Sequence, residues 1–159
     1  MKTLITYYSY SGNTNKMVGI FAGILRQKGE VDMQRLRPKD EITSFLGQCM
    51  AARAGKETDL QDGVIFDASP YDLILLGCPV WALAPTPAMN TYLDKISGLG
   101  GKKVIVLLTS GSGLGVKRCF QNIRKILEEK GASRIDEINI PNRKQSDNDF
   151  VVSSLRKVL

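Results

Sequence analysis

The chain of 159 residues contains no histidine. Without an imidazole it cannot build a Ser-His-Asp triad or a Cys-His pair, and most zinc sites are excluded as well. The three cysteines, Cys49, Cys78 and Cys119, are an odd number without paired spacing, which favours reduced thiols in a cytoplasm. No other side chain stands out as an acid or base, so we predict no catalytic residue and no metal site.

Long apolar runs are also missing. No stretch reaches the length of a membrane span, and Met1 and Lys2 lead into a strand-like segment without a signal-peptide cleavage pattern. We therefore expect a cytoplasmic protein that makes no use of a membrane. Its length and its hydrophobic content of 43% predict a single domain over residues 1–159.

Acidic residues are outnumbered, and the formal net charge is +6. The basic residues are spread along the chain, form no long block and have few aromatic neighbours, so nucleic-acid binding is not expected. A basic surface of this kind is able to steer an acidic partner protein.

Segments with strand and helix patterns alternate along the whole chain. Strands are predicted at 2–8, 31–36, 73–78, 104–109 and 135–140, and helices at 13–28, 42–54, 87–96, 116–130 and 147–158. The segments 73–76 and 104–108 are apolar without alternation, which is typical of central parallel strands covered on both faces. The predicted fold is therefore α/β, an open parallel sheet with helices on both sides.

The most informative segment is Ser9–Thr14, between the first predicted strand and helix. A helix N-terminus offers unpaired N–H groups that favour an anion, and Ser9, Ser11 and Thr14 add hydroxyl donors. Gly12 allows the backbone to approach a ligand closely, and the segment contains no Lys or Arg. The pattern predicts a phosphate site built from neutral donors, as suits the terminal phosphate of a mononucleotide.

Two further loops follow strands at the same predicted edge, where open parallel sheets bind ligands. The segment 77–86 contains Trp81, the only tryptophan, which is able either to stack on a planar ring or to pack against its own domain. The segment 109–115 carries three glycines whose loop can approach the edge of a ring. Other nucleotide motifs fail: a dinucleotide fingerprint, for example, needs glycine where Val116 stands.

With these three loops in place, the chain resembles the flavodoxin-like family of FMN proteins, in its short-chain form, over nearly its whole length. The resemblance implies a five-stranded sheet in the order 2-1-3-4-5 and FMN as the cofactor. It places the phosphate on the first loop and the isoalloxazine ring between the other two. The cofactor-binding residues carried over are Ser9, Tyr10, Ser11, Gly12, Asn13 and Thr14; Pro79, Val80, Trp81 and Ala82; and Thr109, Ser110, Gly111, Gly113 and Gly115.

The chain departs from typical electron-carrier flavodoxins in two respects. It is basic where they are acidic, and the loop 109–115 has neither acidic residues nor a stacking tyrosine. We expect an electron carrier between redox proteins. The alternatives are an FMN-dependent reductase acting on NAD(P)H and a small quinone, and a binding module that has lost the flavin.

Overall fold

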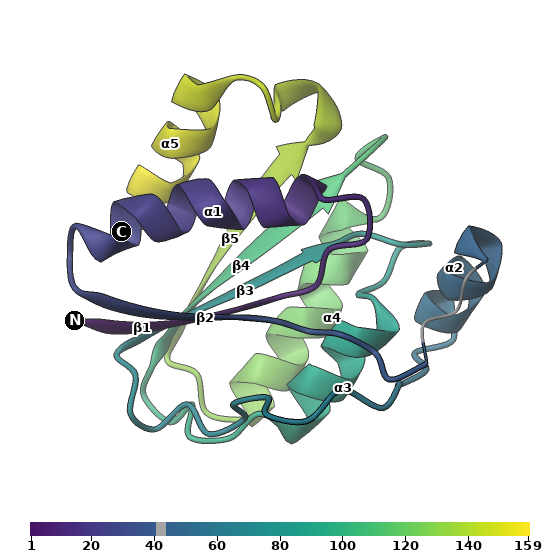
Figure 1. The fold of residues 1–159 in the computed structure, drawn as a ribbon, viewed down its shortest axis with the longest axis horizontal. Helices are drawn as coiled ribbons and strands as arrows, with labels where there is room; N and C mark the ends of the chain where they lie inside the picture. The colour runs from purple at the N-terminus through teal and green to yellow at the C-terminus, as the bar shows by residue number, and fades with distance from the viewer. Residues whose placement is uncertain (41–43) are drawn as a thin grey trace.

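The sheet has the predicted class and the predicted strand order. The computed structural model describes residues 1–40 and 44–159. Its five parallel strands lie in the order β2-β1-β3-β4-β5 (Figure 1). Their bounds are Lys2–Tyr7 for β1, Glu30–Arg35 for β2, Leu73–Pro79 for β3, Lys103–Ser110 for β4 and Arg134–Pro141 for β5.

Helices cover both faces of the sheet, as expected. α1 and α5 lie on one face and α3 and α4 on the other, and α2 lies at the margin of the α3/α4 layer, where its Ala52 joins the core of that face (Figure 1). Their bounds are Asn13–Arg26 for α1, Phe45–Arg53 for α2, Pro87–Lys95 for α3, Val116–Glu129 for α4 and Asn148–Arg156 for α5, with a short 3-10 helix η1 at Asn142–Lys144. Positions 42–43 of the predicted helix 42–54 lie outside the described residues. Among the described residues, none of the helices combines the length and apolar character that a bilayer crossing requires.

The sheet has a hydrophobic core on each face, because successive strand residues point to opposite sides. Leu4, Leu76 and Val106 pack with residues of α3 and α4, whereas Ile5 and Leu75 pack with residues of α1 and α5. β3 and β4 are buried along almost their whole length, which confirms the prediction of central strands covered on both faces.

At Gly77, α1 packs closely against the sheet. A Cβ atom built on Gly77 would lie 3.0 Å from Val18 Cγ2, 3.2 Å from Tyr7 Cβ and 3.4 Å from Thr14 Cγ2. The absence of a side chain there lets the first turn of α1 sit directly above the carboxyl end of β3. Gly77 thus sets how closely the start of α1 approaches the carboxyl end of the sheet.

Replacing Gly77 with valine is expected to lower the free energy of unfolding by about 1–3 kcal/mol, because the added methyl groups overpack the contact with Val18. Urea denaturation measures this. Gly19→Ala is the control: its Cβ meets nothing within 4 Å, and alanine stabilises a helix by up to about 1 kcal/mol relative to glycine. A Gly77→Val variant as stable as the parent protein would contradict this close packing.

Candidate functional site

The first loop joins β1 to α1 and leaves the start of the helix open. Gly12 adopts φ 90° before Asn13 and, as the N-cap residue, has no side chain to cap α1; the Asn15 N–H of the first turn is bound instead by Ser9. A Cβ atom on Gly12 would meet none of the described atoms within 4 Å, so the space above the helix end is free. The N-terminus of α4 has the same form, with Gly115 at φ 77° and no side-chain cap. By contrast, side chains cap α2, α3 and α5. The two uncapped helices are thus the ones that follow the first and third predicted loops.

Ser9 stabilises the first loop from inside. Its side chain is buried, and its Oγ accepts a hydrogen bond from the Asn15 N–H at 3.2 Å. The Ser9 carbonyl oxygen accepts a bond from the Arg35 guanidinium at 2.6 Å. Ser9 therefore holds the loop in shape, while Tyr10, Ser11 and Asn13 lie toward solvent.

A buried hydrogen bond links the first loop to the third. The Thr14 and Thr109 hydroxyl oxygens lie 2.8 Å apart, and both side chains are almost fully buried. These residues are 95 positions apart in the sequence. The bond therefore connects the start of α1 to the end of β4 across the intervening strand β3.

The second loop contains a tight turn with unusual backbone angles. Trp81 and Ala84 exchange two backbone hydrogen bonds of 2.9 and 3.0 Å, with Ala82 at φ 45° and Leu83 at φ 75° between them. Two positive φ angles are typical of a turn that favours Asn-Gly, so two residues with a side chain carry strain of roughly 1–3 kcal/mol each. Such strain is concentrated at functional sites, where the surrounding structure enforces it.

Trp81 is packed as well as placed at the site. Its side chain is only 6% exposed and belongs to the core on the α3/α4 face. The rings of Tyr8 and Tyr10 each meet it edge to face, with centroids 5.6 Å away. The packing role that the sequence left open is thus present, and stacking on a ligand stays a prediction. Tyr10 is 44% exposed and presents more of its ring to solvent.

The third loop packs directly on the second. A Cβ atom on Gly115 would lie 2.4 Å from Leu83 Cδ2 and 2.6 Å from Leu83 Cα. Only a glycine fits against the turn at this distance. The Ser110 hydroxyl donates to Asn139 Oδ1 at 3.0 Å, which ties the start of the loop to β5.

The three loops enclose a cavity of about 340 Å³, a size within the range of ligand sites. Hydroxyl, amide and apolar groups all contribute to its lining, and none of the described lining residues carries a charge at neutral pH. The lining consists of Tyr10, Ser11, Asn13, Thr14, Pro79, Val80, Trp81, Thr109, Ser110, Gly111 and Asn142. The other predicted site residues, Ser9, Gly12, Ala82, Gly113 and Gly115, lie in the loops but not on the cavity wall.

Two residues at this edge were missing from the prediction. Asn142 follows β5 and lines the cavity, and a Cβ atom on Gly111 would lie 3.8 Å from its Nδ2. Arg35 ends β2 and binds the Ser9 carbonyl. Applying the edge rule to the second and fifth strands as well as the other three would have found both.

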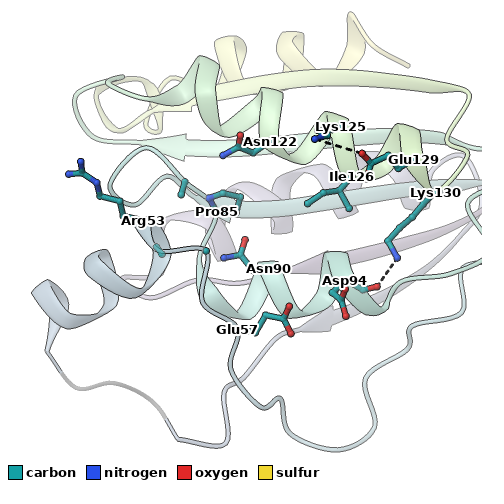
Figure 2. Close-up of a pocket in the computed structure, with 13 residues that line it drawn as sticks. Arg53, Glu57, Pro85, Asn90, Asp94, Asn122, Lys125, Ile126, Glu129 and Lys130 are labelled. Atoms are coloured by element: carbon teal, nitrogen blue, oxygen red, sulfur yellow. Dashed lines mark hydrogen bonds and ion pairs between the residues drawn. The ribbon is translucent and has the colours of Figure 1, made fainter.

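A larger cavity of about 520 Å³ lies between α3, α4 and the end of α2, and Figure 2 shows its lining. Three of its charged side chains are held by neighbours: Lys125 pairs with Glu129 at 3.9 Å, and Lys130 Nζ donates to the Asp94 carbonyl at 2.6 Å. In the part of the chain that the structure describes, neither helix with a glycine N-cap begins at this cavity, so the smaller cavity is the better candidate for an anionic ligand.

The cysteines offer no reactive thiolate near this edge. Cys78 and Cys119 are buried between β3 and α4, and the hydrogen bond from one thiol to the other, together with burial, raises the pKa of Cys119. Burial also raises the pKa of Cys49. A raised pKa keeps the Cys49 and Cys119 thiols protonated and poorly reactive at neutral pH.

Gly115→Ala is expected to displace the 81–84 turn, because its Cβ collides with Leu83. The emission of Trp81, the only tryptophan, should shift, and stability should fall by about 1–3 kcal/mol more than in the control. The control is Gly113→Ala, at nearly the same φ (80° against 77°) but with nothing within 4 Å of the new Cβ. Equal spectra and equal stabilities for the two variants would show that the loops do not depend on this contact.

Comparison with known proteins places the fold in a known group. No curated protein sequence matches this chain significantly. Among solved structures, a flavoprotein from Lactobacillus acidophilus NCFM in complex with FMN has a TM-score of 0.67 at 23% identity, covering 93% of this chain and 97% of that one. A flavodoxin from the domain Archaea has a TM-score of 0.63 at 17% identity, covering 99% of each chain.

An apo NADH:FMN oxidoreductase shares the fold as well, with a TM-score of 0.63 at 13% identity over 100% of this chain and 90% of that chain. Likeness at these identities establishes the fold alone. The family model described as Flavodoxin, however, matches residues 2–145, which is nearly the whole sequence. The chain belongs to the flavodoxin family.

Proposed function

We propose that this protein binds FMN in the cavity between the three loops and transfers electrons as a carrier. The observation that supports this most directly is the start of α1, where a glycine stands at the N-cap and Asn13 and Thr14 line a neutral cavity together with hydroxyl and apolar groups. FMN has matching parts: an anionic phosphate, a polar chain and a flat ring. The FMN complex of the Lactobacillus acidophilus flavoprotein, which has the same fold, agrees with this proposal.

Each part of the cavity suits one part of FMN. Ser11, Asn13 and Thr14 would hold the phosphate at the end of α1. Pro79, Val80 and Trp81 would form the apolar wall against the ring, and Ser110, Gly111 and Asn142 would meet its polar edge. Bound FMN supplies the redox chemistry, because a flavin accepts and releases electrons, and the protein supplies position and electrostatics.

The proposed role as an electron carrier is supported by the absence of charged acid and base groups from the described lining of the cavity. Among the described residues, no carboxylate, amine, guanidinium or thiol belongs to its lining, so no strong acid or base of this part of the chain faces the cavity. Electron exchange with another protein needs none. The fold does not decide the question, since a flavodoxin and an NADH:FMN oxidoreductase both have it. Steady oxidation of NADH or NADPH with a quinone by the FMN-loaded protein would favour the reductase instead.

FMN titration followed by visible absorbance tests the binding site. Thr14→Val keeps the side-chain volume and removes the hydroxyl, so FMN affinity should fall about ten- to a hundredfold, the effect of one hydrogen bond to a charged group. Thr109→Val is the control for the Thr14–Thr109 bond, since it breaks that bond but keeps the Thr14 hydroxyl. An unchanged affinity in Thr14→Val would remove Thr14 from the site, and no FMN uptake by the parent protein would end the proposal.

The neutral cavity predicts a less negative second reduction potential for bound FMN than in acidic flavodoxins, because no carboxylate in the lining opposes the anionic reduced flavin. Asn142→Asp adds one negative charge at the wall and should lower this potential, the interaction amounting to roughly 1–4 kcal/mol at about 4 Å. Spectroelectrochemical titration measures the potential. Asn148→Asp, outside the lining, is the control. A very low potential in the parent protein, or equal potentials in both variants, would contradict the prediction.

A further inference from the structure

The segments around the candidate cavity contain no acidic residue. Asp and Glu are absent from 8–18, 79–93, 109–127 and 138–146, which include all three loops and the segment after β5. Over the whole chain, by contrast, acidic residues number 16 against 22 basic ones. Acidic residues are therefore missing from the segments that form the cavity more completely than the overall composition requires.

Four exposed cations lie on the segments that adjoin the cavity, and we call them the basic rim: Lys16, Lys117, Arg118 and Arg143. None of them forms an ion pair with any residue that the structure describes. At other places ion pairs are common: Lys103 pairs with Asp136 at 3.2 Å, and Arg124 pairs with Glu137 at 2.7 Å. The charge of the rim is thus free to act on a second molecule.

Three cations of the basic rim do not stabilise the helices on which they lie. Lys16 lies in the first turn of α1, and Lys117 and Arg118 lie in the first turn of α4. A cation at a helix N-terminus opposes the helix dipole, and neither first turn contains an acidic residue to balance it. Anionic groups on a partner would relieve this unfavourable arrangement.

Apolar side chains project at the centre of the same edge. Tyr10 is 44% exposed at the tip of the first loop and lines the cavity, and Leu114 is 74% exposed in the third loop. Projecting aromatic and aliphatic groups within a charged rim are typical of protein interfaces. A nicotinamide dinucleotide, the alternative partner, would bind in a concave pocket. The exposed Leu114 side chain therefore suits contact with a protein better than contact with a dinucleotide.

We propose that this edge docks an acidic electron-transfer protein, whose carboxylates pair with the basic rim while its apolar contact covers Tyr10 and Leu114. The docking rests on the proposed function only in that the partner exchanges electrons with the bound cofactor. Charge complementarity over such a surface speeds association and orients the partner over the cavity.

The test is calorimetric binding of an acidic [2Fe–2S] ferredoxin to the FMN-loaded protein, with basic cytochrome c as the comparison protein. The rim variant is Lys117→Glu with Arg118→Glu and Arg143→Glu. The control variant is Arg26→Glu with Lys28→Glu and Lys157→Glu, which changes the net charge equally at exposed sites at the ends of α1 and α5. FMN content is measured beforehand from the visible spectrum of each sample.

Ferredoxin should bind the parent protein, and its affinity should fall as salt is raised, because exposed charges are screened. The rim variant should bind about tenfold or more weakly, whereas the control variant should keep most of the affinity. Equal losses in both variants, no ferredoxin binding at low salt, or tighter binding of cytochrome c would overturn the proposal. The proposal would also be overturned if the rim variant bound NADPH more weakly than the parent protein but bound ferredoxin equally well. A sample that takes up no FMN but binds ferredoxin in this pattern would reject the proposed cofactor and leave the docking surface supported.

Discussion

The parallel pairing of β1 with β3 and of β3 with β4 is the constraint on which the site depends. This register sets Tyr7 beside Gly77 and Pro79 beside Thr109, so the three strands end at the same edge. The loops that follow must then meet, although they are far apart in the sequence. Their contacts, the Thr14–Thr109 bond and the packing of Gly115 on Leu83, are consequences of strand order rather than separate features.

The distribution of charge at this edge has two parts with different effects. The cavity wall is neutral, so an anionic group inside it meets hydrogen-bond donors but no fixed charge. The cations lie outside the lining, on the helix starts and after β5, where dissolved salt at about 0.1 M screens them over about 10 Å. The inner part governs the energy of a bound group, and the outer part governs which molecules approach it.

The sequence was sufficient for the fold because each strand and helix carries its own local signal. Burial on both faces made 73–76 and 104–108 recognisable as central strands, and the glycine- and hydroxyl-rich loops marked the edge. What remained out of reach depends on long-range contacts. That Trp81 packs between two tyrosine rings, that Ser9 points inward, and that Asn142 reaches the cavity are set by neighbours from other strands.

The paired hydroxyls of Thr14 and Thr109 form an element with two orientations. Each hydroxyl has one hydrogen and two lone pairs, so either residue is able to donate to the other. An anion at the start of α1 would select one of them, since Thr14 is free to donate outward only when Thr109 donates to it. Binding of an anion would then fix the Thr109 hydroxyl, at the end of β4, as the donor to Thr14. This change in the direction of one hydrogen bond requires no movement of the backbone.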